Sequence, residues 1–301
     1  WRRQAAAEEA GRLAALGRGL PAAAAQWDDA ELVQRMRPLA RGFRRIRGGS
    51  GHEHAAEQLL QEARRRLEAF DEAAAGAAAD SVAPAATPRR ELLALALKTA
   101  LALGRRQEAE ALLFPPEPVR AVFPYALLLG AYAHAGEAER AFSVYSRMAD
   151  LGVMLPRGAA VPRERGALLE VFNALIGACQ ARGECHSSVL MWMVELEKAG
   201  LAASRRTFHM LAASWARVEE HRRAEEAAHP GHALDAFFAL MARHGVRPNS
   251  TTAQRLLDHC CESEAQIVRL LRHMADAPVA HTTATRVALL RAYVRVGAGE
   301  K

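Results

Sequence analysis

The sequence is poor in the residues that build β-sheets and in long hydrophobic runs. Aromatic residues make up 6% of its 301 residues, and Val, Ile and Thr are too sparse to supply a set of strands. Ala, Leu, Arg and Glu dominate instead, so the composition predicts an all-α fold. The nearest approach to a membrane span, Leu92 to Leu103, is broken by Lys98 and is too short. We therefore expect no membrane partner.

Cysteine usage and the missing catalytic motifs argue against an enzyme. The four cysteines, Cys179, Cys185, Cys260 and Cys261, form no CxxC pair and no framework typical of secreted proteins, so we expect them to be reduced. The GHEH run at Gly51 to His54 lacks the spacing of a zincin or a nucleotide deaminase. GxxxxGK and GxGxxG motifs are absent as well. These absences predict no catalytic residues, no metal, no cofactor and no small-molecule substrate.

The residue present in excess is arginine. The net charge is +6, and lysine occurs only at Lys98, Lys198 and Lys301. Basic side chains that neutralise phosphates release counterions, so this balance favours a polyanionic partner, nucleic acid first. An Ala- and Arg-rich composition is equally typical of a GC-rich genome, and that second interpretation stays open.

The densest basic run is QRMRPLARGFRRIRGG, which ends in two glycines. On a helix, Arg37, Arg41, Arg44 and Arg45 share one broad face. We predict that this run, called the Arg stripe below, binds RNA phosphates, and an ordinary solvated surface is the alternative. Its members are Arg35, Arg37, Arg41, Arg44, Arg45 and Arg47.

Helical hairpins recur from residue 91 to residue 297. The clearest runs from Val122 to Gly152, where two apolar helical faces are separated by Gly136, a residue suited to the left-handed conformation that ends a helix. Two insertions, 156–166 and 219–231, interrupt a period of about 35 residues, and the first reads as an exposed loop. The repeating anchor residues are Leu93, Tyr125, Phe172, Phe208, Ala253 and Arg286. Turn glycines equivalent to Gly136 are Gly104, Gly183 and Gly297.

The part before the hairpins is also expected to be helical. Residues 1–76 carry apolar residues at helical spacing and form a predicted N-terminal helical region. The Ala- and Pro-rich residues 77–90 read as a linker. In this region Arg64, Arg65 and Arg66 stand at helical spacing from Glu57, Glu62 and Glu68, which predicts ion pairs on a helix surface.

The hairpins carry a family likeness. The pattern Val-Phe/Tyr-x-Ala-Leu-Ile/Leu-Gly-Ala, a following Gly-Glu, and the ending Gly-Val-Arg-Pro-Asn at 245–249 resemble the pentatricopeptide repeat. The best match is 122–152, and the Trp-Leu-Gly-Tyr signature of tetratricopeptide repeats is absent. The resemblance implies a right-handed α-solenoid of stacked helix-turn-helix hairpins over residues 91–297, whose first helices line a concave groove.

The same resemblance implies where RNA is read. In that family the groove holds single-stranded RNA, and the fifth and last residues of each motif choose a base. In this sequence these residues are Asn173 with Ser204, and His209 with Asn249. The first pair resembles a combination that favours a pyrimidine, whereas Ala126 with Pro156 offers nothing that can read a base edge. Because one base contact is worth about 1–3 kcal/mol, so few competent positions discriminate little. Helix capping is the alternative role for Asn173.

These features predict a non-enzymatic RNA-binding helical-repeat protein. Degenerate repeats with long insertions favour a structural subunit of a mitochondrial ribosome, or of another organellar ribonucleoprotein, that contacts rRNA. The expected partners are single-stranded RNA or rRNA and other ribonucleoprotein subunits. The localisation implied by the resemblance is the mitochondrion, with the chloroplast as the alternative. Two other functions stay open: a protein-binding scaffold or assembly factor, and a sequence-specific organellar mRNA processing or stability factor.

Overall fold

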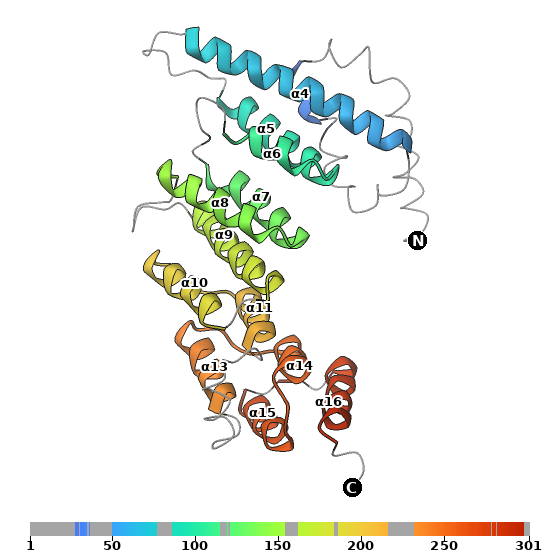
Figure 1. Cartoon of the computed structure of the whole chain (residues 1–301), viewed down its shortest axis with the longest axis vertical. Coiled ribbons are helices and arrows are strands. Elements are labelled where there is room, and N and C mark those ends of the chain that lie inside the picture. Colours follow the sequence, from blue (N-terminus) through green and yellow to red (C-terminus); the bar gives the residue numbers. More distant parts are fainter. Residues whose placement is uncertain are drawn as a thin grey trace. The chain divides into compact units, whose positions relative to one another are not determined.

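In the computed structural model of the chain every described element of secondary structure is a helix, with no strand in the described residues (Figure 1). The described residues are 28–29, 31–34, 36, 50–76, 86–114, 119, 121–153, 162–183, 186–215, 232–277, 279–280 and 282–297. The expected all-α fold of stacked helix-turn-helix hairpins is confirmed. No helix in these ranges is both long enough and apolar enough to cross a membrane.

The chain forms two compact units, residues 1–131 and 132–301. In the first unit, helix α4 packs on α5, and α5 packs on α6. The unit also holds most of α7, where the buried Tyr125 hydroxyl donates to the Leu113 carbonyl (3.2 Å) and the ring meets Phe114 edge to face. Helix bounds are α4 (Ser50–Gly76), α5 (Ala86–Ala102), α6 (Arg106–Ala111) and α7 (Val122–Ala135).

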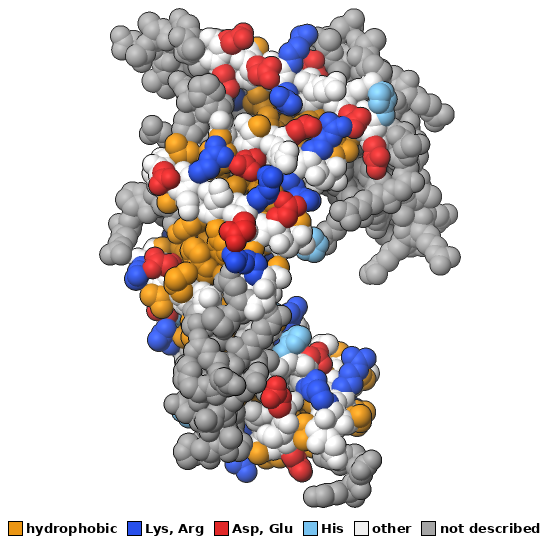
Figure 2. Space-filling view, in the orientation of Figure 1, with side chains coloured by type: hydrophobic (Ala, Val, Ile, Leu, Met, Phe, Trp, Pro, Cys, Tyr) orange, Lys and Arg blue, Asp and Glu red, His pale blue; other side chains and the backbone are white. Residues whose placement is uncertain are grey.

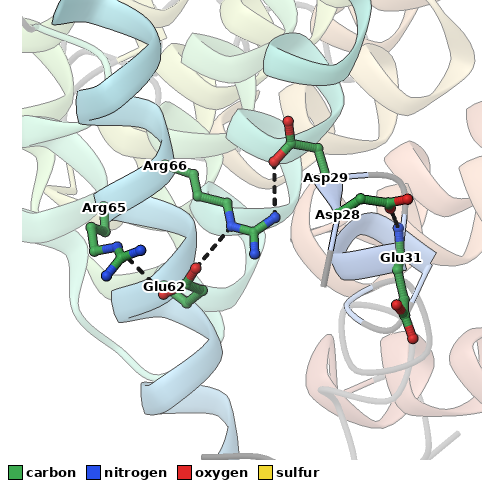
Figure 3. A network of polar contacts seen from close by, with 6 residues as sticks. All are labelled: Asp28, Asp29, Glu31, Glu62, Arg65 and Arg66. Atoms are coloured by element: carbon green, nitrogen blue, oxygen red, sulfur yellow. Dashed lines mark hydrogen bonds and ion pairs between the residues drawn. The ribbon is translucent and has the colours of Figure 1, made fainter. Parts of the chain in front are cut away.

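An arginine network fixes α4 within the first unit (Figure 3). The Arg66 guanidinium donates to Glu62 (2.8 Å) one turn away and to Asp29 (2.9 Å), which lies far away in the sequence. Arg65 lies 3.8 Å from the same Glu62 carboxylate. Arg66 therefore connects α4 to the stretch around Asp29, where Leu32 and Met36 are fully buried. The predicted pairing of this arginine run with Glu62 is confirmed.

The second unit is built from two rows of helices. The first helices of the hairpins, α9, α11, α14 and α16, each pack on the next in that order. Of the second helices, α8 and α10 meet through stacked Phe142 and Trp192, whose ring centroids are 5.9 Å apart, and α13 packs on α15. The bounds are α8 (Ala138–Asp150), α9 (Pro162–Ala181), α10 (His186–Lys198), α11 (Arg205–Trp215), α13 (His232–Arg243), α14 (Ser250–His259), α15 (Glu264–Asp276) and α16 (Thr283–Arg295).

Buried aromatic residues join the two rows. Phe208 of α11 lies edge to face with Phe237 of α13, with ring centroids 5.7 Å apart. Trp215 also packs on Phe237, and its indole N–H donates to the Ala233 carbonyl (2.8 Å). The α11–α13 hairpin therefore closes around large side chains that its two helices share, as the apolar faces predict.

The expected turn glycines adopt the left-handed conformation. Gly104, Gly136, Gly183 and Gly297 have φ values of 76°, 76°, 71° and 73°. At Gly136 the amide donates to the Ala133 carbonyl (3.2 Å), and the next amide, that of Glu137, donates to the Tyr132 carbonyl (3.0 Å). These bonds satisfy carbonyls at the end of α7 and reverse the chain into α8.

Three details differ from the sequence prediction. Helix α5 starts at Ala86, so the end of the expected linker, 86–90, is helical, and α9 starts at Pro162, so 162–166 is not a loop. Proline is tolerated in a first helical turn, where its missing N–H has no partner to lose. The third difference lies at the last anchor position, where Arg286 is exposed and its neighbour Thr285 is buried. The remaining anchors, including Phe172 and Phe208, are buried.

The expected domain limits stay a prediction. Helices α4 and α5, which lie on either side of the first part of the expected linker, pack on each other.

Two glycines in the α7 hairpin test the role of the turn. An added Cβ meets no atom within 4 Å at either Gly130, inside α7, or Gly136, at its end. Gly136→Ala places an L-residue at φ 76°, and we expect a loss of about 1–2 kcal/mol in the free energy of unfolding. Gly130→Ala restricts only the unfolded chain and should stabilise by about 0.5–1 kcal/mol. Chemical denaturation followed by circular dichroism measures both, and equal shifts of the two midpoints would contradict the turn assignment.

Candidate nucleic-acid interface

The first predicted base-reading pair, Asn173 and Ser204, is joined through a third residue. Asn173 lies on α9 with 1% of its surface exposed, and its amide oxygen accepts a hydrogen bond from the Thr207 hydroxyl (2.8 Å). Ser204 caps α11, because its hydroxyl accepts from the Thr207 amide (3.3 Å) while its own amide donates to the Thr207 hydroxyl (3.1 Å). Thr207 therefore links the cap of one first helix to the preceding first helix.

The second pair, His209 and Asn249, repeats this arrangement one helix further on. Asn249 caps α14 by accepting from the Thr252 amide (2.9 Å) and lies 3.0 Å from the Thr252 hydroxyl, which donates to it. The Nε2 atom of His209 lies 3.1 Å from the same hydroxyl. With the hydroxyl proton on Asn249, we assign the imidazole proton to Nε2, from which it is donated to Thr252.

The electrostatics keep this histidine neutral. Burial lowers the pKa of His209, and the adjacent Arg255 guanidinium lowers it further, against the opposing effect of Asn249. At neutral pH His209 is therefore an uncharged hydrogen-bonding group and attracts no phosphate. Its contribution here is the bond to Thr252.

The threonines were not among the predicted site residues. Thr207, Thr252 and Thr285 lie three residues after the caps Ser204, Asn249 and Thr282, and all three are buried. The spacing Ser/Asn/Thr-x-x-Thr is visible in the sequence and is typical of a helix start. What the sequence could not show is that Thr207 and Thr252 also reach the preceding first helix. We call the contact from cap to threonine to preceding helix the threonine bridge.

The threonine bridges occupy the polar groups that were expected to meet bases. Asn173 is nearly inaccessible, and Ser204, His209 and Asn249 are each engaged within the stack. The Asn173 side-chain nitrogen has no hydrogen-bond partner among the described residues. Base contact by these four residues stays a prediction, and it would require the bridges to open.

The Arg stripe, Arg35, Arg37, Arg41, Arg44, Arg45 and Arg47, lies outside the described residues. The sequence nevertheless locates the charge. Basic and acidic side chains are equally numerous in the described residues, so the whole excess of +6 comes from the rest of the sequence. Between residues 35 and 47 there is no carboxylate at all.

Arginines of the described hairpins are largely committed to intramolecular partners. In Figure 2 the Lys and Arg side chains alternate with Asp and Glu over the visible face. Arg206 of α11 pairs with Glu170 of α9 (2.6 Å), and Arg182 pairs with Glu139 (2.8 Å). Arg269 forms a two-pronged pair with Asp235 (2.9 and 2.5 Å), and it holds the pKa of that carboxyl below its usual range. The hairpins therefore present mixed charge, which differs from a uniformly basic groove.

Some arginines instead bind backbone carbonyls at helix ends. Arg295 of α16 donates to the carbonyls of Asp258 (3.0 Å), Cys261 (3.1 Å) and Leu257 at the end of α14. Arg165 donates to the Gly200 carbonyl at the end of α10 (2.9 Å). A cation at a helix C-terminus satisfies free carbonyls and complements the helix dipole. These contacts are structural, which lowers the number of arginines available for phosphate.

No metal centre is found in the described part of the chain, where no three His, Cys, Asp or Glu side chains converge. His54 of the GHEH run bonds to Gln58 one turn later (2.9 Å). Cys179, Cys260 and Cys261 are buried and free of disulfides, and the Cys260 thiol donates to the Ala212 carbonyl (3.2 Å). Burial raises the pKa of Cys260, and it raises that of Cys261 to about 12. These thiols are inert core groups.

Comparison with known proteins gives little beyond the helical arrangement. No family model and no curated protein matches the chain. Among solved structures, two of the pentatricopeptide repeat protein PPR10 in complex with an 18-nt psaJ RNA element, one of a triple cysteine-to-serine variant, are similar at 17% sequence identity. Each alignment covers 97% of this chain and 56% of that chain, with a TM-score of 0.25. This chain therefore spans about half of PPR10, and the low TM-score says nothing about its ligand.

The first threonine bridge is tested by removing one hydroxyl. Thr207→Val keeps the side-chain shape but leaves the buried Asn173 oxygen without a donor and weakens the α11 cap. We expect a loss of about 1–3 kcal/mol in the free energy of unfolding. Thr251→Val, at an exposed position of α14, is the control and should change stability by less than about 0.5 kcal/mol. Urea denaturation compares the two, and equal effects would show that the bridge contributes nothing.

Thiol accessibility tests the packing around the cysteines. Because burial keeps the pKa of Cys261 near 12, its reactive thiolate is scarce at neutral pH and increases only toward that value. We expect iodoacetamide to modify Cys179, Cys260 and Cys261 at least about 100-fold more slowly in the native chain than in the unfolded one. Peptide mass spectrometry reads each site separately. Rapid native labelling of Cys260 or Cys261 would contradict a closed α14–α15 turn.

Proposed function

We propose that this protein is a non-enzymatic RNA-binding helical-repeat subunit whose RNA affinity resides in the Arg stripe, while the hairpin stack serves as a scaffold. The observation that carries the proposal is the distribution of charge. The described residues are neutral as a set, and the carboxylate-free run at 35–47 is the densest part of the basic excess. Phosphate contacts supply affinity without sequence information, so such a protein binds RNA by charge and shape.

The geometry of the threonine bridges argues for structural attachment rather than base-by-base reading. Asn173 is 1% exposed, and Ser204, His209 and Asn249 each use a side-chain polar atom for a bond within the stack. A sequence-specific mRNA factor needs free hydrogen-bonding edges at such positions. We therefore favour a structural part of an organellar ribonucleoprotein that contacts rRNA, with the mitochondrial ribosome as the first candidate and a chloroplast counterpart as the second.

A protein-binding scaffold is the second candidate function. The mixed charge of the visible face and the exposed apolar side chains, such as those of Met191 and Leu290, favour it, because exposed apolar surface suits a protein partner better than a phosphate backbone. The two functions are compatible in one subunit, with RNA held by the Arg stripe and neighbouring proteins held by the stack.

Removing three stripe arginines tests the proposal. Arg37, Arg41 and Arg44, changed together to Ala, should weaken binding to a labelled single-stranded RNA equally for unrelated sequences. If all three contact phosphates, the slope of log affinity against log salt should fall by about 2, since each single-strand phosphate contributes about 0.7. Fluorescence anisotropy titrations over a series of salt concentrations measure both quantities.

A matched control separates the stripe from the stack. The triple variant Arg182→Ala, Arg206→Ala and Arg243→Ala removes the same charge from three side chains that are paired with Glu139, Glu170 and Glu197. It should leave RNA affinity nearly unchanged. A larger loss in this control than in the stripe variant would place the RNA on the stack and overturn the proposal. Sequencing of RNA cross-linked to the chain in cells then distinguishes rRNA from mRNA.

A further inference from the structure

Helix α16 is apolar on two opposite faces. Its inner face buries Thr285, Ala288 and Ala292. Its outer face exposes Val287 (40%), Leu290 (66%) and Val294 (73%), which follow one another at helical spacing. A helix that is apolar all round is normally buried all round. We call the exposed residues Val287, Leu290 and Val294 the outer face of α16.

The equivalent face of every earlier first helix in the stack is covered. Ile176 of α9, Ala212 of α11 and Leu257 of α14 occupy the position of Leu290, and each is fully buried. The contacts on this face come from the next first helix. Asn173 of α9 meets Thr207 of α11, and Gln180 of α9 bonds to the Met210 carbonyl. The outer face of α16 therefore has the form of an interface that takes another first helix.

The charges beside the outer face of α16 define which charged side chains a helix that covers this face must carry. Arg286 and Arg291 lie on either side of the outer face, both exposed, and neither has an ion-pair partner among the described residues. Helix α16 contains no Asp or Glu. Helix α11 also lacks acidic residues, and there Arg206 is neutralised by Glu170 of the adjacent first helix. In that pair the covering helix α11 carries the arginine and the covered helix α9 carries the carboxylate, so the stack already forms Arg–Glu pairs across the interface between adjacent first helices.

We propose that the outer face of α16 is a docking surface for an amphipathic helix of a partner protein with acidic residues beside small ones. The inner face of α16 shows the shape of a covering first helix: Thr285, Ala288 and Ala292 are small and lie at helical spacing behind the cap Thr282. The partner helix presents the same small residues, with Glu or Asp placed to meet Arg286 and Arg291. Two copies of α16 docked symmetrically would set these arginines against each other, which disfavours self-association.

Peptide binding tests the charge and shape requirements. The probe is a stapled helical peptide with a Ser cap, small residues at the spacing of Thr285, Ala288 and Ala292, and Glu on both flanks. A second probe has Lys in place of Glu. By fluorescence anisotropy, the full chain should bind the acidic probe at least about tenfold more tightly than the basic one. The double variant Arg286→Glu and Arg291→Glu should reverse this preference.

Leu290→Glu tests the apolar contact and should weaken acidic-probe binding at least about tenfold. Because Leu290 is 66% exposed, its replacement should leave the circular dichroism spectrum and the melting temperature unchanged. Met191→Glu, at a 53% exposed site on α10, is the matched control and should bind like the native chain.

Three results would overturn the proposal. One is equal affinity of the native chain for the acidic and the basic probe, or equal affinity of the native chain and the Leu290→Glu variant for the acidic probe. Another is a native dimer in sedimentation that Leu290→Glu converts to monomer, since the occupant is then a second copy. The third is loss of RNA affinity without loss of probe binding in Leu290→Glu, which assigns the surface to nucleic acid. None of these outcomes depends on the Arg stripe, so this proposal and the RNA proposal fail separately.

Discussion

Each first helix of the second unit buries its outer side only because another first helix follows it. Ile176, Ala212 and Leu257 are fully buried at one repeating position, and Leu290 at the same position of α16 is 66% exposed. Burying a leucine is worth about 1.5–3 kcal/mol, so each added helix stabilises the one before it by a substantial part of a small protein's total stability. The stack is therefore held together by nearest-neighbour interfaces, and the exposed outer face of α16 leaves apolar surface that a docked helix would bury.

This dependence on neighbours explains why polar residues between first helices form hydrogen bonds within the stack. A polar group buried at such an interface needs a partner, because an unmet hydrogen bond costs about 1–3 kcal/mol. Thr207 and Thr252 meet that need with one hydroxyl each, which serves a helix cap and the preceding helix together. Asn173 and His209 are thereby drawn into holding the stack. The Asn173 side-chain oxygen and the Nε2 atom of His209 could meet RNA only by giving up bonds that the stack already makes.

The sequence predicted most of the fold because the hairpins follow local rules. Helical spacing of apolar residues located both helices of most hairpins, and glycines such as Gly136 and Gly183 marked the turns because only glycine adopts their conformation cheaply. Helix starts were misplaced where Pro88 and Pro162 were interpreted as breakers, although proline fits a first helical turn. Arg286 stands at an anchor position but is exposed for another reason. A residue at this position is buried only where a second helix covers it, as Phe237 covers Phe208. The candidate site was harder still, since the threonine bridges join residues more than thirty positions apart in sequence.

Charge is handled differently in the two parts of the chain, and this difference links the RNA and protein proposals. Within the hairpins, pairs such as Arg206 with Glu170 neutralise many of the cations locally, which weakens their attraction for phosphate. Salt screens what remains beyond a Debye length of about 8–10 Å. A run without carboxylates, such as 35–47, has no such compensation and attracts phosphate whatever its base sequence. Arg286 and Arg291 are uncompensated as well, but they flank the aliphatic side chains of the outer face of α16. Aliphatic surface is better matched by another apolar helix, so a carboxylate beside small residues suits this end of the stack better than a nucleotide does.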